Sequence, residues 1–168
     1  MELREALLRR RSIRKFTDEP VGDEMINELL HAAMSGPSAC NKKPWEFYVV
    51  KSSDAIQRLR STTSFSKMEA PMAIVVCADL EKAMPGGFQT FWIQDTSAAT
   101  ENILLMATDL GLGACWCGVH PVQRSVDRVK DALGLAENII PLNIIWIGHP
   151  DENPDPRDQY DENVVHYL

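Results

Sequence analysis

The chain has 168 residues, of which 45% are hydrophobic and 24% are charged, and these proportions are typical of one globular domain with a real core. They argue against a disordered chain, a collagen and a coiled coil. No stretch approaches the roughly 18 apolar residues that a membrane span needs, and the N-terminus has no uninterrupted apolar segment, so we expect a cytoplasmic protein with no membrane partner.

The formal net charge of −7 is distributed unevenly along the chain. Six of the 17 basic residues lie in the first fifteen positions beside only two acids, so this segment carries +4 and the remainder −11. A nucleic-acid surface needs basic residues spread over a whole face, which disfavours a nucleic-acid partner. A dense arginine cluster in an otherwise acidic protein indicates a local anion site.

Helices and strands alternate in the first half of the predicted structure. Apolar spacing predicts a short amphipathic helix over 2–9 and a second helix that begins after Gly22 and ends near Gly36. Aromatic and β-branched residues predict a strand over 45–50, and a helix over 54–60 follows. The segment 71–78 is apolar throughout, which predicts a strand buried on both faces.

The second half begins with the longest periodic segment, 88–110, which predicts a central helix ended by Gly111 and Gly113. A strand over 114–117, a helix over 122–133 and a strand over 139–147 complete the expected core. The tail from His149 carries three prolines and ends in apolar residues, so we expect it to dock on another surface. Without repeats or a composition break, residues 1–168 are predicted to form a single domain.

The run Arg10-Arg11-Ser12-Ile13-Arg14 is the first candidate site. Arginine presents a planar fork of donors that can bind a phosphate group bidentately, and a serine hydroxyl adds a neutral donor. Together these side chains can hold a phosphomonoester. The plainer alternative is a solvated helix end.

Two further segments are candidate parts of a ligand site. The loop from Gly36 to Trp45 has small residues and two prolines, so a rigid backbone there can approach a flat ligand closely, although such residues are also ordinary in turns. The segment Gly111–Gly118 can present backbone N–H groups to a redox ring, and its alternative is a helix cap followed by a buried strand.

Four strings in the chain are similar, in order, to the four motifs of the FMN-dependent nitroreductase family. They are RRSIRKF near the start, PSACNKKPWEF, GLGACWCG after the long helix, and IGHP followed by Arg157. Each string is weak by itself, whereas four in the right order with fitting gaps are specific. The resemblance covers nearly the whole chain.

The resemblance implies an α+β, nitroreductase-like fold, with a central and mostly antiparallel sheet flanked by helices. It also implies an intertwined homodimer with exchanged C-terminal tails, which holds FMN between its subunits. The resemblance implies that the FMN phosphate, ribityl chain and pyrimidine edge are bound by Arg10, Arg11, Ser12 and Arg14, with a further phosphate contact from Arg157. It implies that the partner subunit contributes Pro37, Ser38, Ala39 and Asn41. It also implies that the ring is lined near its nitrogen N5 by Trp116, Cys117 and Gly118. Lys67 is a further candidate for the pyrimidine edge.

The implied activity is electron transfer from NADH or NADPH to a nitroaromatic, quinone or flavin acceptor, by ping-pong kinetics. No side chain need act as acid or base, because the flavin carries the hydride. Many relatives have Glu where this chain has Cys117 and Gln where it has Lys43, and the second difference bears on acceptor preference. Alternatives are a non-catalytic flavin-binding or storage protein, and a specialised relative such as a reductive dehalogenase or a flavin-destroying enzyme.

Other residues are predicted to be structural. Cys115, Cys117 and His120 have the wrong spacing for a Cys-x-x-Cys pair and lack an evident fourth ligand, so no metal site is expected. The four cysteines are expected to be reduced thiols. Trp45, Trp92 and Trp116 are expected to be core or interface aromatics, and of the three only Trp116 lies in a motif that argues otherwise.

Overall fold

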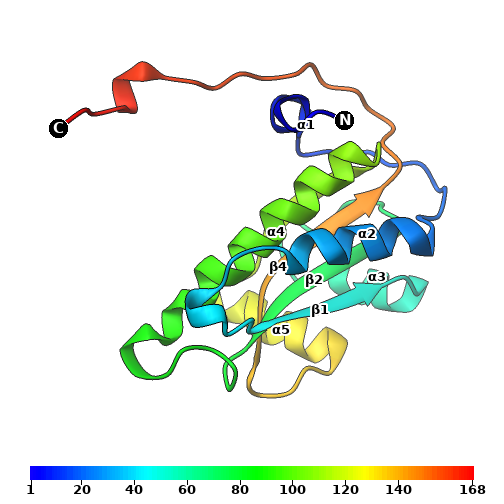
Figure 1. Ribbon diagram of the computed structural model, residues 1–168. Helices are drawn as coiled ribbons and strands as arrows, with labels where there is room; N and C mark the ends of the chain where they lie inside the picture. Colours follow the sequence, from blue (N-terminus) through cyan, green and yellow to red (C-terminus); the bar gives the residue numbers. More distant parts are fainter.

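The computed structural model describes residues 1–168 and places a four-stranded sheet between two pairs of helices (Figure 1). The order across the sheet is β1-β2-β4-β3, and every neighbouring pair is antiparallel. The strands are β1 (Trp45–Val50), β2 (Met72–Asp79), β3 (Gly113–Gly118) and β4 (Ile139–Gly148). The predicted α+β class with an antiparallel central sheet is confirmed.

Each face of the sheet has its own helices and its own core. On one face, Ile74 and Ile145 pack with the helices α2 (Asp23–Met34) and α4 (Trp92–Asp109). On the other, Val75 and Trp146 pack with α3 (Ser53–Arg60) and α5 (Gln123–Leu133). Because successive strand residues point to opposite faces, covering both faces requires the uninterrupted apolar run, and every residue of β2 is buried.

The central helix begins later than its apolar pattern predicts. Residues Gly86–Phe91 form a 3₁₀ turn, η2, and the α-helix starts at Trp92. Gly86 has a φ of 63°, and two consecutive glycines disfavour an α-helix, so the pattern extends beyond the helix itself. At the other end, Gly111 takes the left-handed conformation with a φ of 74°, which agrees with the predicted stop.

The N-terminal segment and the tail lie side by side at one end of α4. The helix α1 (Leu3–Arg9) contacts α4, and the tail runs back along the segment that follows α1. The backbone N–H of Thr17 donates to the His149 carbonyl at 2.9 Å, and that of Arg157 donates to the Leu8 carbonyl at 3.0 Å. Beyond Arg157 the tail leaves the body of the chain, passes through the short turn η3 (Glu162–Val164) and ends exposed (Figure 1).

Other sequence expectations concern single residues. Trp45 and Trp92 are buried, as expected of core aromatics, whereas Trp116 is 37% exposed. The four cysteines are free, and only Cys40 is exposed. None of the helices combines the length and the apolar character needed to cross a bilayer.

Candidate flavin site

Five of the predicted residues meet around one cavity. Arg157 of the tail joins the arginines and the serine of the N-terminal motif, and the cavity has a volume of about 490 Å³. Its lining is Leu7, Arg10, Arg11, Ser12, Arg14, Glu152, Pro154, Arg157 and Gln159. We call this cavity the arginine pocket. Residues 10–14 and residue 157 are far apart in sequence, and the fold brings them together.

The edge of β3 fixes the N-terminal motif. Ser12 forms a parallel bridge with Ala114, and the Ile13 N–H donates to the Ala114 carbonyl at 3.0 Å. Gly113 permits this approach, because a Cβ atom there would lie 2.6 Å from Cγ2 of Ile13. The glycine is therefore part of how the arginine pocket is built.

Neighbouring acceptors orient three of the four guanidinium groups. Arg10 Nε lies 3.4 Å from the Glu101 carboxylate, and Arg11 Nη1 donates to the Asp155 carbonyl at 2.7 Å. Arg14 Nη1 donates to the Ser12 carbonyl at 3.3 Å. Each of these groups keeps further N–H donors for a ligand, since a guanidinium has five. A cavity lined by four guanidiniums and a hydroxyl has the chemistry of a site for a phosphate dianion.

Glu152 is the one carboxylate that lines the arginine pocket. Its Oε1 accepts the backbone N–H of Arg14 at 2.5 Å and that of Lys15 at 3.2 Å. These hydrogen bonds, that of Arg14 first, lower the pKa of Glu152 below its usual value. Sequence reasoning missed this residue, because it is one of several acids in a polar tail and no pattern distinguishes it.

The open edge of β3 continues the site beyond Ala114. The Ala114 carbonyl accepts from Ile13, whereas the Val119 N–H donates to the Leu142 carbonyl of β4. Since backbone groups alternate in direction along a strand, those of Trp116 and Gly118 face away from β4. Trp116 and Gly118 are exposed, and β3 is the end strand of the sheet with its one outer bridge at Ala114, so this stretch of edge is uncovered.

Cys117 differs from its two neighbours. It is buried, its backbone groups face β4, and its Sγ lies 3.3 Å from the Phe65 carbonyl. A hydrogen bond with Cys117 lowers the pKa of the Cys115 thiol to about 7, and Arg14 contributes to that shift. The same hydrogen bond raises the pKa of Cys117.

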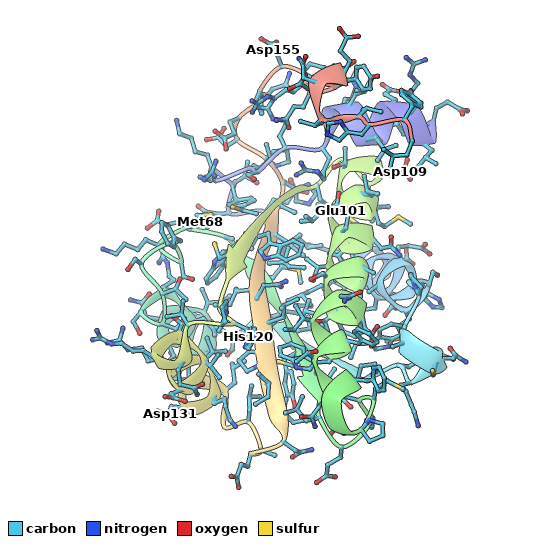
Figure 2. All side chains as sticks on the ribbon, turned by 90° about the vertical axis from the view of Figure 1, so that its left-hand side faces the viewer. Met68, Glu101, Asp109, His120, Asp131 and Asp155 are labelled. Carbon is cyan, nitrogen blue, oxygen red and sulfur yellow. The ribbon has the colours of Figure 1, made fainter.

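Lys67 lies in the loop between α3 and β2, and this loop reaches β3 through the contact between Phe65 and Cys117. Its side chain is exposed and does not line the arginine pocket. Figure 2 shows the neighbouring Met68 on the side of the molecule away from α4. The structure thus brings the loop of Lys67 to the strand without bringing its ammonium group to the arginines.

The remaining candidates, Pro37, Ser38, Ala39 and Asn41, do not line the arginine pocket. Their loop includes the turn η1 (Ala39–Asn41), and the Ala39 N–H donates to Asp95 near the start of α4 at 2.8 Å. The arginine pocket lies toward the other end of that helix, because Asp155, whose carbonyl binds Arg11, and Asp109, the last residue of α4, lie at the same end of the molecule in Figure 2. Asn41 has a φ of 55°, and left-handed non-glycine residues of this kind gather at functional sites. Within one chain, this loop therefore does not contribute to the arginine pocket.

A family model described as "Nitroreductase family" matches residues 7–64 and 60–149. The chain belongs to this nitroreductase family. A candidate NADH dehydrogenase/NAD(P)H nitroreductase of Methanothermobacter thermautotrophicus is 43% identical, over 99% of this chain and 86% of the relative.

Two solved nitroreductase structures extend the likeness to the fold. An FMN-dependent nitroreductase of Clostridium difficile R20291 is 32% identical with a TM-score of 0.88, and the match covers 97% of each chain. A candidate nitroreductase of Desulfovibrio desulfuricans, solved in complex with FMN, is 28% identical with a TM-score of 0.87, over 100% of this chain and 97% of that one. The predicted family, the nitroreductase fold and the oxidoreductase class are confirmed.

Proposed function

We propose that this nitroreductase binds FMN and transfers electrons from NADH or NADPH to a nitroaromatic, quinone or flavin acceptor. The observation that carries the proposal is the arginine pocket beside the open edge of β3. The pocket offers four guanidiniums and one hydroxyl in a cavity of about 490 Å³, which suits a flavin phosphate. The adjoining edge of β3 is exposed at Trp116 and Gly118, which leaves room for a flat ring.

The chain's own groups have separate tasks in this proposal. Arg10, Arg11, Ser12, Arg14 and Arg157 bind the phosphate, ribityl chain and pyrimidine edge. Trp116, Cys117 and Gly118 lie along the isoalloxazine ring near N5, and Lys67 reaches the pyrimidine edge from its loop. The outward N–H groups of Trp116 and Gly118 stabilise negative charge that develops on the ring. FMN supplies the hydride chemistry, and no side chain is proposed as a catalytic acid or base.

We also propose that the working protein is a homodimer, in which Pro37, Ser38, Ala39 and Asn41 come from the second copy. Two observations support this. The loop lies outside the arginine pocket of its own chain. The tail carries exposed apolar side chains at its end, including Val164, Tyr167 and Leu168, and an exchanged tail would bury them against the partner.

The nicotinamide donor and the acceptor are proposed to use the same uncovered ring face in turn. Ping-pong kinetics follow, because the first product must leave before the acceptor can bind. Initial rates measured against one substrate at several fixed concentrations of the other would then give parallel lines in a double-reciprocal plot. Lines that intersect would show a ternary complex and contradict a shared face.

The visible spectrum of the purified full chain tests the function. We expect the absorption bands of oxidised flavin, and their anaerobic loss on addition of NADH or NADPH identifies the donor. Reoxidation by a panel of nitroaromatics, quinones and free flavins then identifies the acceptor class. A yellow protein that neither nucleotide bleaches would instead be a flavin-binding or storage protein, and a protein that gains no colour when FMN is supplied contradicts the proposal altogether.

A further inference from the structure

Glu152 has an unusual place in the arginine pocket, because a carboxylate there opposes the binding of a phosphate by charge alone. Its Oε1 already has hydrogen-bond partners. It accepts two consecutive backbone N–H groups, at 2.5 Å from Arg14 and at 3.2 Å from Lys15. The carboxylate therefore holds the stretch of backbone from which the Arg14 side chain extends.

The stretch Arg14–Lys15 lies between two anchors. On one side, Ile13 is bonded to Ala114 of β3 at 3.0 Å. On the other, Phe16 forms a bridge with Pro150 of the tail, and the Lys15 carbonyl accepts the Asp151 N–H at 2.9 Å. Between these anchors, the backbone N–H groups of Arg14 and Lys15 bind no backbone carbonyl. Glu152 supplies both of their acceptors and so fixes the direction in which Arg14 leaves the backbone.

Resting on the proposed function, we infer that Glu152 is a positioning residue for the flavin phosphate. Its carboxylate clamps the Arg14–Lys15 backbone to the tail and thereby holds the Arg14 guanidinium in the arginine pocket. The inference concerns the phosphate end of the cofactor only. Riboflavin has the same ring but no phosphate, so it distinguishes this role from a general effect on the fold.

The experiment compares three variants of the full chain, stripped of flavin and titrated with FMN or riboflavin by fluorescence. Glu152→Ala should weaken FMN binding at least tenfold and leave riboflavin binding within about twofold of the wild type. Glu152→Gln keeps an oxygen acceptor at the same place, so it should bind FMN within about threefold of the wild type. Asp151→Ala is the matched control, because Asp151 is the adjacent exposed acid, its carboxylate makes no hydrogen bond or ion pair, and its backbone N–H to the Lys15 carbonyl is kept.

Several results would overturn the inference. These are Glu152→Ala binding FMN as Asp151→Ala does, Glu152→Ala losing both flavins equally, or Glu152→Gln performing no better than Glu152→Ala. If Glu152→Ala does not fold, Glu152→Asp replaces it, since one methylene less withdraws the oxygen and must give the same selective loss. Failure of the wild type to bind FMN would instead remove the proposed function, so the two failures are distinguishable.

Discussion

The arginine pocket and the loop Pro37–Lys43 are held by different kinds of contact. The pocket joins segments from the two ends of the chain through bonds to β3, to α4 and to the tail, all within one chain. The loop is fixed to its own helix through Ala39 and Asp95 and to itself through the Lys43 N–H and the Ser38 hydroxyl at 3.0 Å. Cys40, Asn41 and Lys43 in this loop have φ values of 49°, 55° and 49°, a conformation that costs backbone energy for residues other than glycine.

The two halves of the proposed site therefore have different physical requirements. A phosphate dianion requires several charge-assisted donors at fixed positions, which one chain can preorganise before any partner arrives. A flat ring requires covering, and a rigid, exposed loop with small residues can supply that cover from a second copy. On this view the pocket holds the phosphate and the loop encloses the ring, and stable FMN binding needs both.

The largest expected effect comes from removing two guanidiniums of the pocket. Arg10→Ala combined with Arg14→Ala should release the flavin. Each charge-assisted hydrogen bond contributes about 1.5 to 3 kcal/mol, so affinity should fall by about 10² to 10⁴-fold. Titration of the stripped protein with FMN measures the dissociation constant.

The control for this variant changes two arginines elsewhere. Arg124 and Arg128 on α5 are exposed and make no ion pair, so Arg124→Ala with Arg128→Ala removes the same charge away from the site. It should keep its flavin. Full flavin occupancy in the Arg10 and Arg14 double variant would show that the arginine pocket is not the phosphate site.

The second prediction tests whether pocket and loop come from different copies. Ser38→Asp with Asn41→Asp places carboxylates in the loop, and Asp tolerates the left-handed backbone of position 41. This variant and the Arg10 and Arg14 variant are co-expressed with different tags, and the heterodimer is purified through both. We expect almost no flavin in either homodimer and one flavin in each heterodimer, by absorbance against protein concentration.

The reason is that each heterodimer combines one intact pocket with one intact loop at a single site. If both elements acted within the same chain, every site of the heterodimer would carry a defect. A heterodimer without flavin would contradict a site composed of both copies. The first prediction tests the arginine pocket separately.

Much of the fold was predictable from the sequence, because the signals are local. The apolar run of β2 indicates burial on both faces, and Gly111 marks the end of α4. The pattern failed at 88–91, where apolar spacing continues through a 3₁₀ turn and only Gly86 and Gly87 carry the contrary signal. Boundaries depend on such competing local preferences, and periodicity alone does not resolve them.

The site was predictable only in part, because its geometry depends on long-range contacts. The arginine motif and Arg157 were found through charge and through the family resemblance. Glu152 and Glu101 were not, since their importance comes from which backbone or guanidinium each one meets in the folded chain. The sequence also did not show how Cys117 differs from Trp116 and Gly118. The strand register shows that the backbone groups of Cys117 face β4 inside the sheet.

The smallest expected effect comes from one methyl group beneath the pocket. Gly113→Ala places a Cβ 2.6 Å from Cγ2 and 2.9 Å from Cβ of the buried Ile13, so Ile13 and the flanking Ser12 and Arg14 must move. Overpacking of this kind costs about 1 to 3 kcal/mol, measurable as a lower free energy of unfolding in urea. Because the displaced segment carries two pocket residues, FMN should also bind several-fold more weakly.

Gly87→Ala is the matched control, since a Cβ there meets nothing within 4 Å and its φ lies outside the left-handed range. It should leave unfolding and FMN binding near their wild-type values. If Gly113→Ala lowered stability but left FMN affinity unchanged, the contact between Ile13 and β3 would hold the fold without shaping the pocket. Residues 10–14 would then keep their geometry through the tail and α4, which makes Glu152, Asp155 and Glu101, rather than the edge of β3, the principal supports of the phosphate site.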